Sequence, residues 1–165
     1  MVYCRLETPL GPMLAAASNS AITGLWFVGQ NHFPRVPDDW QHEQDTALFN
    51  DLGLQLDSYF KGRLSVFSLP LALEGTPFRR EIWSLLQDIP PGMTTTYGAL
   101  AHRLSDKKGG VIVSARAVGG AVGHNPIAIL VPCHRVVGAD GSLTGYAGGL
   151  IRKKALLDLE RSQSN

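Results

Sequence analysis

Cysteine is scarce in this sequence of 165 residues, which contains Cys4 and Cys133 and no others. Two thiols cannot form a disulfide framework, and without a C-x-x-C pair the sequence offers no zinc site of the common kind. The G-x-S-x-G pattern of serine hydrolases is also absent. Free thiols are typical of a reducing compartment, so we expect a cytoplasmic protein.

Long hydrophobic runs are lacking as well. The segment between Arg116 and Arg135 carries no formal charge, but glycines, Asn125 and two prolines interrupt it, so we reject a membrane span. The early Glu7 and the breaks near it do not fit a secretory signal. A hydrophobic fraction of 44% and a charged fraction of 18% describe an ordinary globular protein of one domain or two small ones.

Charge is unevenly divided, although the net value is +1. Residues 1–102 contain six Lys and Arg against ten Asp and Glu, whereas residues 103–165 contain nine against four. A basic segment on a nearly neutral chain is the kind of surface that a polyanion would use. A chance excess on a solvated face explains the charge equally well, so other features must decide.

Residues 1–75 are predicted to form a small α+β domain with an antiparallel sheet. Turn-forming residues separate short apolar runs, which is typical of a meander of strands, at residues 2–9, 13–18 and 22–28. Residues 31–45 are predicted to be a loop. A further strand is expected at residues 64–73, where Pro70 indicates an edge or an end. One helix should begin at Thr46, since apolar residues then recur at helical spacing as far as Tyr59.

Residues 76–165 are predicted to form a second, mostly helical domain. Thr76-Pro77, Thr95 or Thr96, and Ser114 are suitable N-caps or helix starts. Helices are therefore expected near residues 77–89, 97–105 and 115–123, and an amphipathic helix at residues 150–160 closes the chain. A short apolar strand, residues 127–131, should lead into Pro132-Cys133.

The second and third of these helices resemble a helix-turn-helix. The third is unusual, because nearly all its residues are small and Arg116 is its one long cation. Paired glycines cost about 1 kcal/mol each in a helix interior relative to alanine. Close packing of two helices would explain them. A smooth surface that approaches a nucleic-acid groove, with Arg116 projecting into it, explains them equally well and favours the minor groove.

Cys133 stands next to His134, and this pair indicates either a buried structural thiol or a nucleophile with its base. An imidazole or cation near a thiol favours the reactive thiolate. Adjacent residues of a strand point to opposite faces, so direct contact would require a bend at Pro132 or a bridging water. A third group should orient the imidazole, and Glu160 and Asn125 are both candidates. The glycine-rich segment 138–149 contains Tyr146 and predicts either a plain hairpin or a loop over a flat substrate.

These segments together resemble one family, the O6-alkylguanine-DNA alkyltransferases, also called methylated-DNA–protein-cysteine methyltransferases. The resemblance rests on five segments: TPFRREIW (76–83), TTYG (95–98), ARAVGGAVGHNPI (115–127), VPCHRVVG (131–138) and TGYAGG (144–149). It implies an α+β fold with a ribonuclease H-like N-terminal layout and a winged helix-turn-helix-like second domain. Residues 1–75 resemble the family only in layout.

The resemblance also implies a reaction: direct reversal of O6-alkylguanine damage, with O4-alkylthymine as an open second substrate. Cys133 would accept the alkyl group in a single turnover. His134 would act as its base through a water, Glu160 would orient that imidazole, and Asn125 would hold the active-site turn. Tyr97 would crowd the phosphate of the target nucleotide and donate a proton to the departing guanine.

Further roles are implied for the DNA surface and the base pocket. Arg116 would fill the gap left by the extruded base, and the DNA-facing surface would include Tyr97, Gly98, Ala115 and Gly119. Tyr146 would wall the base pocket, with backbone groups near Val136 and Ala147 reading the guanine edge. The implied partner is duplex DNA bound through its minor groove by a monomer, with cooperative assembly as the open alternative. No cofactor and no metal are expected.

The sequence departs from the family pattern at residues 105–114, where the connection between the two DNA-facing helices is longer than usual. Lys107 and Lys108 in this connection could contact phosphates, or the connection could simply be mobile. Two other functions stay open at this point: a lesion sensor that does not react, and a cysteine hydrolase that uses Cys133 and His134. The cysteine itself argues against the sensor, and a hydrolase has no need of a small-residue helix bearing Arg116.

Overall fold

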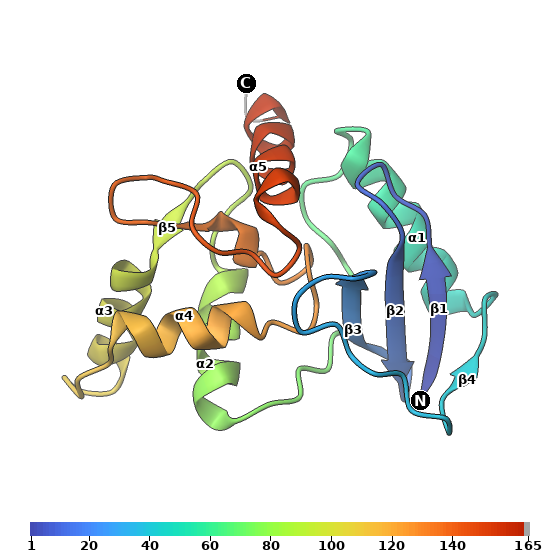
Figure 1. Cartoon of the computed structure of the whole chain (residues 1–165), viewed down its shortest axis with the longest axis horizontal. Coiled ribbons are helices and arrows are strands. Elements are labelled where there is room, and N and C mark those ends of the chain that lie inside the picture. The colour runs from blue at the N-terminus through green and yellow to red at the C-terminus, as the bar shows by residue number, and fades with distance from the viewer. Residues whose placement is uncertain (164–165) are drawn as a thin grey trace.

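The N-terminal part of the protein contains a four-stranded sheet, whose strands lie side by side in Figure 1. The computed structural model describes residues 1–163. Strand order is β3-β2-β1-β4, with bounds β1 Val2–Leu6, β2 Met13–Ser18, β3 Ala21–Phe27 and β4 Gln41–His42. The first three strands form the expected antiparallel meander. The short β4 pairs in parallel with β1, so the sheet is mixed and the purely antiparallel prediction is wrong. Both residues of β4 are exposed, and they gave no apolar signal.

Helix α1, Ala47–Phe60, packs on this sheet as the apolar spacing predicts. The Thr46 side chain accepts a hydrogen bond from the backbone N–H of Phe49 and so caps the first turn. Four side chains of the helix are buried: Phe49, Leu52, Leu56 and Tyr59. Tyr59, at the C-terminal end of α1, reaches beyond the sheet toward the second half of the chain.

Residues 64–73 do not form the predicted strand. Leu71 makes an isolated bridge to Ile22, whose backbone N–H donates to Pro70 O and whose carbonyl accepts from Ala72 N, each at 2.8 Å. Pro70 has no N–H to extend a ladder. Further along the same edge, Leu25 pairs with residues 126–128. Two segments therefore cover the edge of β3, and one of them belongs to the C-terminal half.

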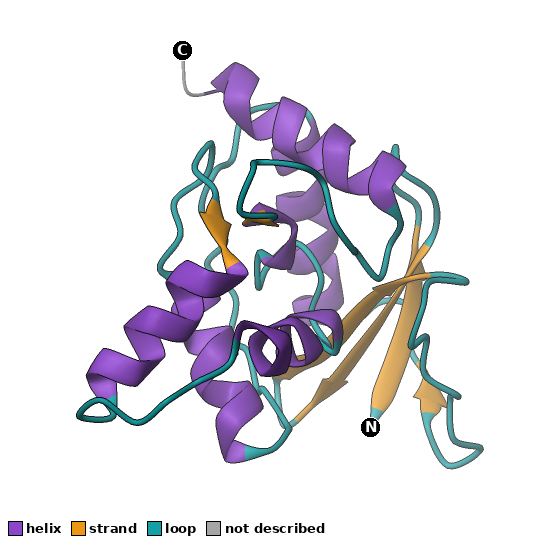
Figure 2. Cartoon of the chain, turned by 60° about the vertical axis from the view of Figure 1, so that its left-hand side comes forward, coloured by secondary structure: helices purple, strands orange, loops and turns teal. Residues whose placement is uncertain are grey.

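The C-terminal half is mostly helical, with α2 Pro77–Gln87, α3 Tyr97–Lys107, α4 Ala115–Gly123 and α5 Leu150–Gln163. Thr76, Thr96 and Ser114 each accept a hydrogen bond from the N–H three residues later, so the predicted caps are confirmed. Helices α3 and α4 pack against each other and on α2, while α5 crosses above them (Figure 2). In the described part of the chain, no helix is long and apolar enough to cross a bilayer.

The predicted strand at residues 127–131 is wrong, and the difference shapes the centre of the protein. Ile127 makes one bridge to Leu25, and the chain then turns, with Ile129 at a φ of 70°. Residues Cys133–Arg135 form a short 3-10 helix, η1, followed by β6, Val136–Val137, which pairs in parallel with β5, Thr95–Thr96. Cys133 therefore lies at the start of a tight helical turn, where the rule that neighbours point to opposite faces does not apply.

A continuous buried core joins the two halves. It includes Phe27 and Tyr59 from the first half together with Leu86 and Val131 from the second. Arg152 of α5 adds a polar link, because its guanidinium donates to Leu10 O and lies 4.5 Å from the centre of the Phe27 ring. The domain boundary predicted after residue 75 remains a prediction.

Candidate active site

The Cys133 thiol lies nearly buried at the end of the turn that Asn125 organises. The Asn125 amide donates to Val131 O at 2.7 Å and to Ile127 O at 3.3 Å, while its own carbonyl accepts from Ile127 N at 3.0 Å. The same Nδ2 lies 3.1 Å from Cys133 Sγ. One buried side chain thus supplies the hydrogen bonds that a strand ladder would otherwise give, and it also touches the sulfur.

Glu160 connects α5 to the turn through a buried network. Its Oε2 accepts from His134 Nε2 at 2.9 Å, from Arg135 Nη2 at 2.8 Å and from the Tyr59 hydroxyl at 2.7 Å. Its Oε1 accepts from Arg135 Nε at 2.8 Å. Burial alone would raise the pKa of the Glu160 carboxyl, but the hydrogen bonds from Arg135 and His134 outweigh it and hold that pKa well below its usual range. Glu160 is therefore ionised at neutral pH.

An ionised Glu160 fixes the tautomer of His134. A carboxylate can only accept, so Nε2 carries the proton and Nδ1 is left with its lone pair. Within residues 1–163, Nδ1 has no hydrogen-bond partner, which also means that it makes no direct bond to Cys133 Sγ. Burial lowers the pKa of His134 despite the opposing effect of Glu160, so the ring is neutral at pH 7 and able to take up a proton.

The two thiols of the chain differ in their surroundings. Burial raises the pKa of Cys4 to about 11. Burial also raises the pKa of Cys133, but the Asn125 hydrogen bond and the positive charge of Lys153 act in the opposite direction. A buried thiol reacts poorly until a base removes its proton. Cys133 is thus the thiol built to react, and it depends on a nearby base.

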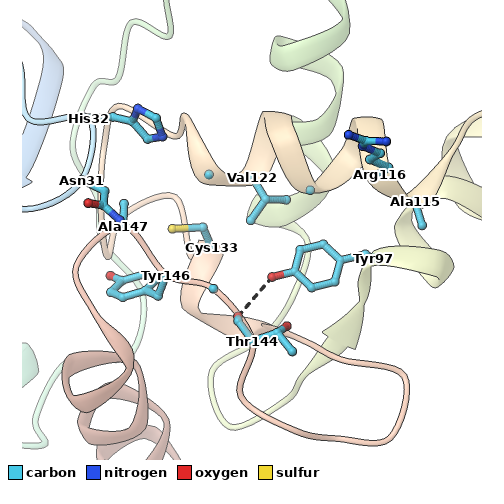
Figure 3. Close-up of a pocket in the computed structure, with 13 residues that line it drawn as sticks. Asn31, His32, Tyr97, Ala115, Arg116, Val122, Cys133, Thr144, Tyr146 and Ala147 are labelled. Carbon is cyan, nitrogen blue, oxygen red and sulfur yellow. Dashed lines mark hydrogen bonds between the residues drawn. The ribbon is translucent and has the colours of Figure 1, made fainter.

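A pocket of about 610 Å³ opens beside Cys133, between α4 and the segment 144–147 (Figure 3). Seven of the residues singled out from the sequence line it: Tyr97, Ala115, Arg116, Gly119, Cys133, Tyr146 and Ala147. The ring of Tyr97 faces the pocket from the start of α3, and its hydroxyl donates to Thr144 O at 3.3 Å. Gly98 is exposed at the N-terminal end of α3 and is outside the pocket lining.

Val136 does not line this pocket. Its carbonyl accepts from Lys153 Nζ, a buried ammonium that also binds Thr144 O at 2.7 Å and Gly145 O at 3.2 Å. Lys153 thereby ties the pocket loop to β6. Ala147 does line the pocket, but its carbonyl accepts from Asn31 N at 3.0 Å. The carbonyl oxygens of Val136 and Ala147 therefore both already accept a hydrogen bond.

Tyr146 forms one wall of the pocket beneath Cys133 (Figure 3). Gly148 allows its ring to lie close to the backbone, because a Cβ at that position would be 2.6 Å from the Tyr146 ring and 2.9 Å from Phe27. Such distances are far inside van der Waals contact, so a larger residue at 148 would displace the wall.

Several residues of the site were not predicted from the sequence. Asn31 and His32 line the pocket from the N-terminal half, and the His32 ring lies tilted against the His124 ring with centroids 4.1 Å apart. They lie in the segment predicted to be only a polar loop. Tyr59 was taken as an apolar helix position, although its hydroxyl binds Glu160. Arg135 and Lys153 are buried cations. The only sequence signals for their burial are the position of Arg135 next to His134 and that of Lys153 on the inner face of α5.

Comparison with known proteins agrees with this geometry along nearly the whole chain. Residues 1–73 match the family model described as "6-O-methylguanine DNA methyltransferase, ribonuclease-like domain", and residues 77–162 match the one described as "6-O-methylguanine DNA methyltransferase, DNA binding domain". The chain belongs to the 6-O-methylguanine DNA methyltransferase family. The methylated-DNA–protein-cysteine methyltransferase of Methanosarcina acetivorans is 43% identical over 162 residues, which are 98% of this chain and 99% of that relative.

Bacterial members of the family are equally similar. The methylated-DNA–protein-cysteine methyltransferase of Mycobacterium leprae is 45% identical over 165 residues, which cover 99% of this chain and 94% of the relative. Among solved structures, that of Mycobacterium tuberculosis OGT in complex with DNA superposes with a TM-score of 0.86 at 43% identity, covering 99% of this chain and 94% of the other. The predicted family and fold are confirmed, with the sheet corrected from antiparallel to mixed.

Removing the Tyr59 hydroxyl tests whether the N-terminal half tunes this site. In Tyr59→Phe, Glu160 loses one donor and interacts more strongly with His134, so the pKa of the imidazole should rise and the acid limb of the alkyl-transfer rate should move to higher pH. Loss of a hydrogen bond to a charged group should also lower the free energy of unfolding by about 1.5–3 kcal/mol. Tyr3→Phe, on β1 and outside the network, is the control. An unchanged pH profile in Tyr59→Phe would show that the hydroxyl is only structural.

Proposed function

We propose that this protein repairs O6-alkylguanine in duplex DNA by moving the alkyl group to Cys133. The observation that carries the proposal is the nucleophile in its setting: a thiol at the base of an open pocket, touching Asn125 and next to a neutral imidazole fixed by Glu160. This arrangement supplies a nucleophile, a base and a group that orients the base. The family to which the chain belongs supports the same reaction.

The chemical step is a direct displacement at the alkyl carbon. The Cys133 proton passes through a bridging water to His134 Nδ1, and the thiolate attacks the carbon. The S–C bond forms as the O6–C bond breaks, and the departing guanine takes up a proton. Tyr97, at the rim of the pocket, is placed to donate that proton. The proton held by His134 then returns through solvent to Tyr97, so that atoms and charge balance without a metal or cofactor.

The product explains why each molecule acts once. An S-alkyl cysteine is a thioether, which is a poor leaving group, and within the described site there is no second thiol near Cys133 to accept the alkyl group. The protein is thus consumed in proportion to the lesions that it repairs. This property separates the proposed transferase from a cysteine hydrolase, which would release many products per molecule.

Access to Cys133 requires the damaged base to leave the duplex. The O6 alkyl group of a stacked guanine cannot reach a sulfur that lies at the base of a pocket, and extrusion costs a few kcal/mol. Helix α4 supports entry from the minor groove, since its exposed residues apart from Arg116 are small and a Cβ at Gly120 would meet only open space. Arg116, exposed at the pocket rim, would occupy the gap in the base stack.

The flipped base would lie against Tyr146, below Cys133. The Val136 carbonyl accepts from Lys153 and the Ala147 carbonyl accepts from Asn31. Backbone groups near these two residues would therefore bind the edge of the guanine only if they are groups other than these carbonyls, or if the loop rearranges. We further propose that the protein binds DNA as a monomer and works in the cytoplasm, where a reducing environment keeps Cys133 as a thiol.

Arg116→Ala tests base extrusion. This variant should repair alkylated duplex at least tenfold more slowly, because nothing fills the gap in the stack, yet it should react with free O6-benzylguanine at the normal rate. Single-turnover rates on both substrates measure the effect. Arg161→Ala, an exposed cation on α5, controls for a general loss of positive charge. Equal losses on duplex and free base would remove the role of Arg116 in extrusion.

A further inference from the structure

The connection between α3 and α4 displays two apolar side chains to solvent. Val111 is 57% exposed and Ile112 is 93% exposed. The connection stands out at the end of the α3–α4 pair in Figures 1 and 2. The proposed alkyl-transfer chemistry makes no use of this stretch.

Hydrogen bonds fix both ends of the connection. Gly110 N donates to Ser105 O at 2.9 Å and Gly109 N to Asp106 O at 3.2 Å, with both glycines at positive φ, which closes the end of α3. At the other end, Ser114 caps α4 through Ala117 N. Between them, Val113 packs against the core. The connection is therefore anchored on both sides of residues 111–112, which we call the apolar tip.

The apolar tip is close to the surface that the proposed function assigns to DNA. Ile112 precedes Arg116 by four residues, which can span at most about 14 Å. A duplex advances about 3.4 Å per base pair, so the tip can reach about four base pairs from the flipped nucleotide. Cations stand on both sides of the tip in sequence: Lys107 at the end of α3 and Arg116 at the start of α4. Lys108 is paired with Glu81 at 2.9 Å, so Lys107 is the better phosphate contact of the two lysines.

We propose that the apolar tip packs into the minor groove beside the lesion, with Ile112 as its main contact. The inference rests on the proposed function, because it needs the same duplex on the same side of α4. Proteins that deform the minor groove commonly place apolar side chains against its sugars and base steps, with cations on the neighbouring phosphates. An apolar tip next to Lys107 and Arg116 has this composition.

Ile112→Ser tests the contact on alkylated duplex too short to hold two molecules. We expect its affinity to fall about tenfold, from the lost burial of one large aliphatic side chain. Ile151→Ser is the matched control, since Ile151 is 88% exposed on α5, and its affinity should equal that of the wild type. Both variants should react normally with free O6-benzylguanine. If Ile112→Ser bound the duplex as tightly as Ile151→Ser, the proposal would be overturned.

Salt dependence separates this contact from charge and from self-association. Ile112→Ser should leave the slope of log K against log salt unchanged, whereas Lys107→Ala should reduce it by about 1. A variant that bound the short duplex normally but lost cooperative binding on a long one would show that a second copy of the chain covers the tip, and would overturn the proposal. Failure of the proposed function itself would look different, because free O6-benzylguanine would then leave Cys133 unmodified in every variant.

Discussion

Cys133→Ala is expected to remove all alkyl transfer while leaving DNA binding intact. Alanine keeps the small volume of the side chain but supplies no nucleophile, and Asn125 retains its backbone partners Ile127 and Val131, so the turn should persist. Mixing the variant with alkylated duplex should leave every lesion in the DNA. Binding to the same duplex, measured by fluorescence anisotropy, should be close to that of the wild type.

The other cysteine provides the control for this experiment. Cys4 is fully buried in the core and its pKa is raised to about 11, so Cys4→Ala should lower stability but keep one equivalent of transfer. Repair by Cys133→Ala at the wild-type level would refute the assigned acceptor. Loss of transfer in both variants, with both folded, would point to an acceptor that depends on the two thiols together.

Glu160→Gln is expected to lower the free energy of unfolding by about 3–5 kcal/mol, the usual cost of breaking a buried ion pair. Arg135 would remain buried without its counter-charge. The amide NH₂ of glutamine would also face at least one of the donors that now bind the carboxylate. Urea unfolding at pH 7 measures the change, and exposed Glu43→Gln is the control with an expected change near zero.

The same variant should change how stability depends on pH. Because the pKa of Glu160 is depressed in the folded state, its contribution to stability is complete above its unfolded pKa, about 4.3, and is lost as pH falls toward the folded pKa. The wild type should therefore lose stability steeply below about pH 4, and Glu160→Gln should lose less over the same range. If the free energy of unfolding fell equally with pH in the two proteins, this result would contradict the network around Glu160.

Local sequence signals predicted the helices well, because their information lies within a few residues. Thr76, Thr96 and Ser114 mark helix starts through their own hydroxyls, and apolar spacing marks the buried face of α1. The two wrong strands, at residues 64–73 and 127–131, are apolar segments whose backbone partners are distant. Pro70 limits the first to one bridge, and the Asn125 side chain replaces the ladder of the second.

The residues of the site also divide into those that the sequence indicates and those that depend on distant partners. Cys133 and His134 could be predicted as a reactive pair, and the family resemblance implied Glu160, Asn125 and Arg116. The structure brings the first four together around one turn and puts Arg116 at the rim of the pocket. Sequence could not indicate that Tyr59 reaches Glu160, since the two are separated by about a hundred residues and meet only when the N-terminal helix docks. The pocket contributions of Asn31 and His32 depend on the same docking.

Intact-protein mass spectrometry after mixing with methylated duplex tests the central idea most directly. Every molecule that removes a lesion should gain the mass of one methylene group, the modified peptide should contain Cys133, and the number of modified molecules should equal the number of lesions lost. Lesions that disappear while the protein keeps its original mass, or that outnumber the protein molecules, would contradict the account.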